Sequence, residues 1–291
     1  MEIKKVAVIG GGTMGNGITH VFALNNFNVS LVEVSEELYN RAIGTITKNL
    51  DRQVKKEVIK EEEKENTLKN ISKVIGVDNT PKDVDLVIEA VYENKDVKLS
   101  IFNKLNNLVK PDTIFASNTS SISITELSAS VRPDKFIGMH FMNPVPMMKL
   151  VEIIRGYSTS DQTYQTIKTL AEKLGKVPVE VFDYPGFISN RVLLPMINEA
   201  VFALMEGVAS AEDIDTVMKL GMNHPMGPLT LADFIGLDVC LAIMEVLYNG
   251  FNDPKYRPCP LLKKMVTAKK LGRKTGEGFY KYDENGKIIY E

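Results

Sequence analysis

The chain has 291 residues, enough to bury a large core in one or two domains. Apolar residues make up 44% and charged residues 25%, and the formal net charge of −2 gives no reason to expect a nucleic acid or an anionic membrane as partner. No apolar run approaches the roughly 20 residues that span a bilayer, and the first predicted strand leaves no room for a signal peptide. Cys240 and Cys259 fit neither a disulfide framework nor a metal site, so we expect a cytoplasmic protein with reduced thiols.

A glycine-rich segment stands near the start of the chain. The first predicted strand, residues 6–9, runs into glycines, and apolar residues then recur at helical spacing. In a Gly-x-Gly-x-x-Gly turn between strand and helix, Gly10 permits the tight turn, Gly12 lets a pyrophosphate approach the backbone, and Gly15 lets the helix pack on the strand. The helix N-terminus adds N–H groups and a positive dipole end. Alone the motif is weak evidence, because glycines also interrupt ordinary loops.

An acidic residue supports this interpretation. Residues 28–34 are the second predicted strand, and Glu33 stands at its end, 18 residues beyond Gly15. A carboxylate there can accept hydrogen bonds from both ribose hydroxyls of an adenosine and repels a 2′-phosphate. A solvated charge at a strand end is the alternative. The combination favours dinucleotide binding, with NAD rather than NADP.

Residues 35–60 are predicted to form a helix that projects into solvent, because its apolar spacing thins while its charge rises. Residues 61–64 are predicted to be a solvated face or a connection. Lys55 and Lys56 could meet the phosphates of a large anionic substrate, but from spacing alone an ordinary solvated face is favoured.

Strands at 84–90 and 113–117, with a helix at 97–108 between them, predict parallel βαβ crossovers. Ligands of open α/β sheets bind at the carboxyl ends of the strands. The polar residues 118–121 follow such an end and are therefore candidates for a site, although a Ser/Thr cluster is more often a helix cap.

Histidine and glutamate lie close together in the middle of the chain. His140 stands in a predicted strand, 135–141, and Glu152 interrupts an apolar strand, 150–154. A buried carboxylate is costly unless it is paired. If the two strands are neighbours, Glu152 accepts from one ring nitrogen and leaves the other as a base; a core pair without substrate is the alternative. For the remaining histidines, His20 and His224, structural roles are favoured.

The alternation of strands and helices ends after a strand at 177–182. Helices are predicted at 190–206, 210–221, 229–248 and 261–271. The first of these is apolar almost all round, which predicts burial on several sides or a subunit interface. We therefore predict an α/β domain over residues 1–186 and a helical domain over residues 187–291.

Seven segments together resemble the 3-hydroxyacyl-CoA dehydrogenase family, most closely its short bacterial 3-hydroxybutyryl-CoA dehydrogenases, over essentially the whole chain. They are residues 8–15, 116–121, 138–144, 149–154, 183–191, 224–228 and 272–280. The resemblance implies a Rossmann-like, doubly wound, mostly parallel sheet with a second, all-helical domain that forms a homodimer. It also implies NAD as cofactor, with NADP possible, and reversible oxidation of an (S)-3-hydroxyacyl-CoA to the 3-oxoacyl-CoA.

The resemblance also assigns residues. His140 falls on the general base, Glu152 on its orienting carboxylate, Ser120 on the serine that touches the substrate oxygen, and Asn190 on the active-site asparagine; Thr119 or Ser121 could replace Ser120. The substrate-binding positions are Ser120, Asn190, Asn49 and Lys56, which reverses the interpretation of Lys56 from spacing. The cofactor-binding positions are Gly10, Gly12, Thr13, Met14, Gly15, Glu33, Ala90, Glu93, Lys98, Ser120, Asn143 and Lys274.

Two other functions compete with this one. The first is a dehydrogenase of a small free hydroxy acid on the same fold, against which the basic helix around Lys56 argues. The second is a catalytically silent NAD(H)-binding protein, against which the joint presence of Ser120, His140, Glu152 and Asn190 argues.

Overall fold

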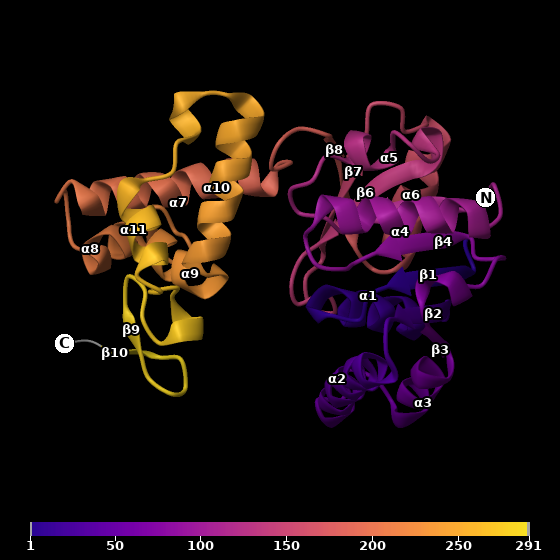
Figure 1. Cartoon of the computed structure of the whole chain (residues 1–291). Helices are drawn as coiled ribbons and strands as arrows, with labels where there is room; N and C mark the ends of the chain where they lie inside the picture. The colour runs from indigo at the N-terminus through magenta and orange to yellow at the C-terminus, as the bar shows by residue number, and fades with distance from the viewer. Residues whose placement is uncertain (1, 290–291) are drawn as a thin grey trace. The chain divides into compact units, whose positions relative to one another are not determined.

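The computed structural model describes residues 2–289, which divide into two compact units, one ending at Tyr184 and the other beginning at Pro185 (Figure 1). Each unit has its own apolar core. Within residues 2–289, no helix combines the length and the apolar character that crossing a membrane requires.

The first unit is built on an eight-stranded sheet in the order β3-β2-β1-β4-β5-β6-β7-β8. All neighbouring strands are parallel except β6 and β7, which are antiparallel. The central strands are buried along almost their whole length and are mostly apolar, because helices cover both faces of the sheet. The strands are β1 (Lys5–Ile9), β2 (Asn28–Glu33), β3 (Ile71–Ile75), β4 (Leu86–Glu89), β5 (Ile114–Ser117), β6 (Phe136–Phe141), β7 (Leu150–Arg155) and β8 (Val177–Phe182).

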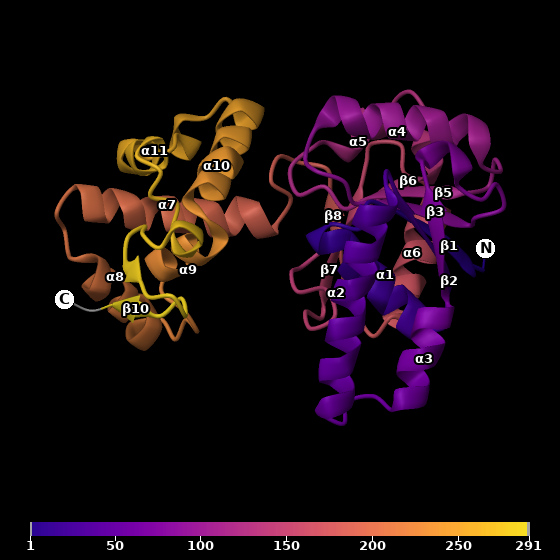
Figure 2. The same ribbon diagram turned by 60° about the horizontal axis from the view of Figure 1, so that its bottom comes forward.

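The helices of this unit are α1 (Thr13–Leu24), α2 (Glu36–Lys55), α3 (Glu61–Lys69), α4 (Lys95–Leu108), α5 (Ile124–Ser128) and α6 (Asp161–Lys173). Helices α1 and α6 share one core with alternate side chains of the strands. On the other face, Phe102 of α4 packs on Phe115 and Phe136, with ring centroids 5.6 and 4.7 Å apart. Figure 2 shows α4 and α1 on opposite sides of the sheet. The predicted doubly wound α/β class is thus confirmed.

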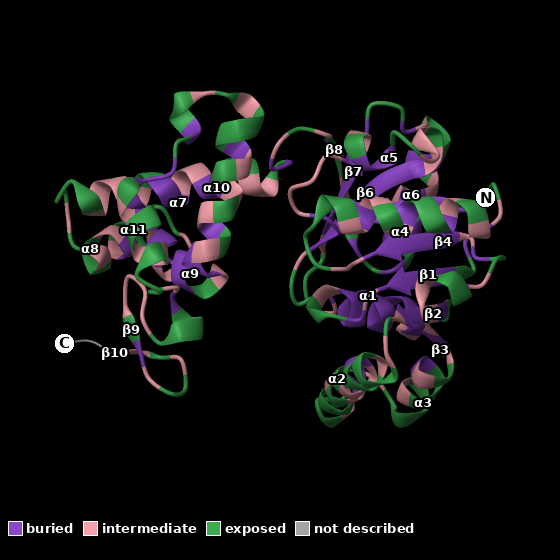
Figure 3. Cartoon of the chain, viewed as in Figure 1, coloured by how far each residue is buried: buried purple, intermediate pink, exposed green. Residues whose placement is uncertain are grey.

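The region around residue 56 differs from the prediction. Helix α2 ends at Lys55, Glu57 adopts a left-handed φ of 57°, and α3 begins at Glu61. The predicted connection 61–64 is therefore the first turn of a helix, where Glu63 accepts from Lys60 N at 2.8 Å. Figure 2 shows α2 and α3 side by side, extending from the sheet, and Figure 3 shows how exposed both are compared with the buried α1. The predicted projection into solvent is confirmed.

The second unit consists mainly of helices: α7 (Ser189–Met205), α8 (Ala211–Thr216), α9 (Pro228–Ile235), α10 (Leu237–Phe251) and α11 (Pro260–Thr267). A π-turn (Val217–Gly221) continues α8, and β9 (Lys281–Tyr282) pairs antiparallel with β10 (Ile288–Ile289). Short 3₁₀ turns lie in the two units at Val77–Asn79, Pro133–Lys135, Pro254–Tyr256 and Arg273–Thr275.

Two predictions for this unit need correction or refinement. The single helix expected over 229–248 is wrong, because Gly236, at φ 104°, breaks it into α9 and α10. In α7 the buried residues are Leu194, Ile197, Asn198 and Val201, which form one face, while Val192 is 69% exposed. Burial of α7 on several sides within the chain is therefore excluded, and the subunit interface stays a prediction.

Candidate active site

The turn between β1 and α1 has the shape that the glycines predict. Gly10 adopts φ 92°, and a Cβ on Gly15 would lie 1.7 Å from Gly10 O, so neither position accepts a side chain without strain. A Cβ on Gly12 would meet nothing within 4 Å. The backbone before α1 therefore faces open space at the positive end of the helix dipole, an arrangement that fits a pyrophosphate.

Glu33 lies beside this turn. Its Oε1 accepts from Gly11 N at 2.5 Å, and its Oε2 accepts from Val34 N at 3.1 Å. A cavity of about 440 Å³ opens here between the glycine turn, helix α2 and the segment after β6. Its lining includes the predicted site residues Gly12, Thr13, Glu33, Asn49 and Asn143, together with Arg41 and Thr45 on α2.

We expect Glu33→Ala to lose selectivity for NAD over NADP, because the substitution removes the carboxylate that repels a 2′-phosphate. Steady-state kinetics with both nicotinamide cofactors measure the ratio of their kcat/KM values. An unchanged ratio would show that this carboxylate does not face the ribose.

His140 and Glu152 are directly opposite one another on the antiparallel strands β6 and β7. The ring nitrogen His140 Nδ1 lies 2.7 Å from Glu152 Oε2, and the two residues are 7% and 2% exposed. The predicted proximity of the two strands is thus confirmed. With a carboxylate accepting from Nδ1–H, the lone pair of the neutral ring is on Nε2.

The hydroxyl loop, which we define as residues 117–121, lies at the end of β5, next to β6. Glu93 Oε1 accepts from Thr119 Oγ1 at 2.5 Å, from Ser120 N at 3.0 Å and from Ser121 N at 3.1 Å. Partial desolvation works against the charge of Glu93, but Lys98 and the hydroxyl groups of Thr119 and Ser121 outweigh it and lower the pKa of the carboxyl. The loop is therefore held on a charged carboxylate.

Four other predicted residues lie in the first unit. Lys98 is 1% exposed, and its Nζ lies 2.7 Å from Glu89 Oε1 and 3.2 Å from Glu93 Oε2. Ala90 packs against Gly10 and Gly15. Met14 packs partly buried on the core, and Lys56 is exposed just after α2.

Two predicted residues belong to the second unit. Asn190 is half-buried in the first turn of α7. Lys274 lies in the loop that precedes β9, and its Nζ is 2.5 Å from Oδ1 of Asp238 in α10. Their roles toward substrate and cofactor stay predictions.

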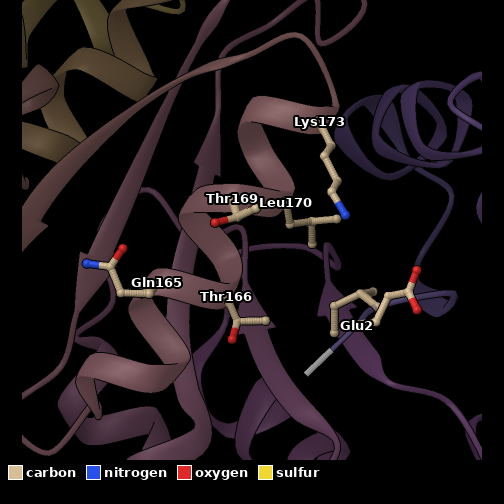
Figure 4. A pocket seen from close by; sticks show the side chains of 7 residues that line it. Glu2, Gln165, Thr166, Thr169, Leu170 and Lys173 are labelled. Carbon is tan, nitrogen blue, oxygen red and sulfur yellow. The ribbon is translucent and has the colours of Figure 1, made fainter.

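A separate cavity of about 270 Å³ lies between α6 and the residues before β1 (Figure 4). Its lining includes Glu2, Gln165, Thr169 and Lys173 and none of the predicted site residues. The glycine turn follows the carboxyl end of β1, whereas this cavity adjoins the segment before its amino end, so it is not part of the candidate site.

Two charged residues that hold the site, Glu89 and Lys176, were not predicted from the sequence. Glu89, at the end of β4, is 0% exposed. Lys176 is 8% exposed and its Nζ donates to Val145 O at 2.6 Å and to Met148 O at 2.8 Å, which fixes the cavity segment after Asn143. Glu89 could have been found, because it is an acid that follows the apolar run 86–88, a signal similar to the one that singled out Glu152.

His20 lies in α1 and is only 1% exposed, which agrees with the structural role favoured from the sequence. Burial, and to a smaller extent the charge of Lys176, lower the pKa of this imidazole, while the nearby Gln53 opposes the shift only in part. When the pH falls below the ordinary histidine pKa of about 6.5, His20 of the unfolded chain binds a proton, whereas His20 of the folded chain binds it less readily. The free energy of unfolding should therefore fall as the pH drops through this range.

We expect His20→Gln to reduce this dependence. Urea unfolding of wild type and variant at about pH 7.5 and about pH 5.5 measures it. The wild type should lose more stability between the two conditions than the variant does. Equal losses would mean that His20 is not responsible.

Comparison with known proteins places this geometry in a family. The model of the 3-hydroxyacyl-CoA dehydrogenase NAD-binding domain matches residues 5–184, and that of the C-terminal domain of the same family matches residues 186–282. The chain belongs to the 3-hydroxyacyl-CoA dehydrogenase family. Its first unit is thus the family's NAD-binding domain, NAD is the cofactor, and the protein is an oxidoreductase.

Individual relatives of this chain agree with the family assignment. A probable 3-hydroxybutyryl-CoA dehydrogenase of Deinococcus radiodurans is 56% identical over 96% of this chain and 100% of its own length. Human mitochondrial hydroxyacyl-coenzyme A dehydrogenase is 43% identical over 96% of this chain and 91% of its own. The crystal structure of (S)-3-hydroxybutyryl-CoA dehydrogenase from Ralstonia eutropha, 51% identical, matches with a TM-score of 0.95 over 97% of this chain and 100% of that one.

Proposed function

We propose that this protein interconverts (S)-3-hydroxyacyl-CoA and 3-oxoacyl-CoA, with 3-hydroxybutyryl-CoA and acetoacetyl-CoA as the principal pair. The observation that carries the proposal is the buried His140–Glu152 pair at 2.7 Å, in the same sheet as the dinucleotide turn. The names of the relatives from Deinococcus radiodurans and Ralstonia eutropha, both 3-hydroxybutyryl-CoA dehydrogenases, support the substrate class.

His140 is the general base of this mechanism. The C3 hydroxyl of the substrate must lose its proton as the carbonyl forms, and the lone pair on Nε2 of the neutral ring accepts that proton. Glu152 accepts from Nδ1–H, keeps the ring in this tautomer and stabilises the imidazolium that results. In the reverse direction the imidazolium returns the proton to the alkoxide.

NAD, when bound at the glycine turn, would supply the acceptor for the hydride of C3. Ser120 and Asn190 orient the substrate by binding its hydroxyl and thioester oxygens, which reduces the entropy cost of bringing the reacting centres into line. Ser120 suits this role because Glu93 fixes its backbone N–H at 3.0 Å.

The CoA part of the substrate is assigned to α2. Asn49 lines the cavity, and Lys56, exposed one residue beyond the helix, supplies a positive charge for a phosphate. For the rest of the protein, we propose a homodimer formed through the helical domain and a cytoplasmic location. Nucleic acids and membranes are not expected partners.

Loss of NADH absorbance on addition of acetoacetyl-CoA tests the activity. Free acetoacetate is the matched substrate without CoA, and we expect it to react far more slowly. Equal rates on the free acid and its CoA ester would favour the small hydroxy-acid dehydrogenase, and no NADH loss with either would exclude the proposed reaction.

A further inference from the structure

Glu89 is a fully buried carboxylate to which neither the motifs nor the proposed mechanism assigns a role. It ends β4, and both of its oxygens are occupied. Oε1 accepts from Lys98 Nζ and from Val91 N, each at 2.7 Å. Oε2 accepts from Ser117 Oγ, in the hydroxyl loop, at 2.6 Å. Glu89 thus joins helix α4 to the ends of β4 and β5.

Lys98 extends this contact to the far end of the hydroxyl loop. Its ammonium, almost completely buried, lies between Glu89 Oε1 and Glu93 Oε2, at 2.7 and 3.2 Å. Glu93 in turn accepts hydrogen bonds from the backbone N–H groups of Ser120 and Ser121. A movement of Lys98 would therefore displace the carboxylate on which Ser120 is held.

Glu89 also holds the near end of the loop and its link to the catalytic strand. Ser117 Oγ, which donates to Glu89, accepts from Thr119 N at 3.2 Å. The backbone oxygen of Glu89 accepts from Asn118 N at 2.9 Å, and Asn118 Oδ1 accepts from Phe141 N at 3.0 Å. Since Phe141 follows His140 directly, Glu89 contacts both sides of the reaction site, the hydroxyl loop through its carboxylate and the strand of His140 through its backbone oxygen.

We propose that Glu89 is a positioning residue for the reaction: through Lys98, Glu93 and Ser117 it sets the place of Ser120 relative to His140. The inference rests on the proposed function for its catalytic consequence. Its structural part, the fixing of the hydroxyl loop, stands on the contacts alone.

The cost of this arrangement supports a positioning role. Two carboxylates share one buried lysine, and burial raises the pKa of Glu89 despite Lys98, so keeping Glu89 ionised is costly. Replacing a buried ion pair by apolar side chains is often neutral for stability or favourable. The charges are therefore better explained by the geometry they impose on the loop than by stability.

Glu89→Gln tests the proposal in the full-length protein. The amide keeps the shape but removes the charge that holds Lys98, and a shift of Ser120 by about 1 Å would lower kcat by about 100-fold. At the other end of β4, the Asp85 carboxylate likewise accepts hydrogen bonds from one lysine, Lys110 Nζ at 2.5 Å, and from two backbone N–H groups. Asp85→Asn is therefore the matched control. Its kcat should stay within about twofold of wild type, even if Tm falls equally.

Hydrogen exchange gives a readout that does not depend on the substrate. Amides of residues 118–122 should exchange faster in Glu89→Gln than in wild type or Asp85→Asn. Should the wild type not reduce acetoacetyl-CoA, the proposed function fails, and this exchange experiment still decides the positioning role. A folded Glu89→Gln with wild-type exchange and kcat within about twofold of wild type would overturn the inference, as would an equal kcat loss in Asp85→Asn.

Ser117→Ala keeps the test valid if Glu89→Gln does not fold, and Lys98→Met extends the test if it does. Ser117→Ala retains every charge, and faster exchange with a smaller kcat loss is expected. Lys98→Met breaks the same connection. Adding Glu89→Gln to Lys98→Met should lower kcat little further, because the effects of substitutions within one network are not additive. Fully additive losses of kcat in the double variant, or unchanged exchange in Ser117→Ala, would contradict the proposal.

Discussion

His140→Gln should lose at least 100-fold in kcat while it retains NADH binding. General-base assistance is worth about 10² to 10⁴ in rate, and the glutamine side chain cannot accept the proton of the C3 hydroxyl at neutral pH. His140 lies on β6, whereas the turn that fits the dinucleotide lies between β1 and α1, so NADH affinity should not change. Stopped-flow reduction of acetoacetyl-CoA measures the rate, and NADH fluorescence measures the affinity.

Two companion variants show whether the effect belongs to the pair. Glu152→Gln removes the charge 2.7 Å from Nδ1, so it should also lower kcat, by less than His140→Gln, because the imidazole remains. His20→Gln removes another buried histidine of the same unit and should leave kcat near wild type at neutral pH. Near-normal turnover in His140→Gln would exclude this residue as the base and leave a structural core pair as the explanation.

The sheet edge where His140, Glu152 and Ser120 lie was predictable from sequence because local signals encode it. Strand ends are marked by glycine, by hydroxyl residues or by a lone acid within an apolar run, and parallel strands bring such ends to one edge. The expected pairing of β6 with β7 needed only one further condition, that consecutive strands are neighbours. The structure confirms it.

What sequence reasoning missed depends on contacts between distant segments. Strand β3 has only Ile71 and Val74 buried among its five residues, too few for an apolar pattern. Lys176 reads as a surface lysine until the folded chain places its Nζ on two carbonyl oxygens some thirty residues earlier. Gly236 looks like a tolerated helix glycine, and only its backbone conformation shows that it separates two helices.

Gly15→Ala should lose stability, whereas Gly12→Ala should keep its stability and lose cofactor binding. At Gly15 the new Cβ would lie 1.7 Å from the backbone oxygen of Gly10, and neither backbone segment can give way without opening the β1–α1 turn. A clash of this kind belongs with the rare substitutions that cost more than about 4 kcal/mol, a large share of the 5–15 kcal/mol typical of a whole protein. We expect Gly15→Ala to unfold or to melt at a much lower temperature.

Gly12→Ala should instead fold and fail to bind its cofactor. The Cβ meets no protein atom within 4 Å, so Tm should stay close to wild type, but the methyl group occupies the space through which a pyrophosphate approaches the backbone. NADH should bind at least tenfold more weakly, a loss of about 1.4 kcal/mol. Gly44→Ala, an equally open site within α2, is the control and should leave affinity unchanged. If Gly12→Ala binds NADH as wild type does, the dinucleotide does not lie on this turn, whatever the stability of Gly15→Ala.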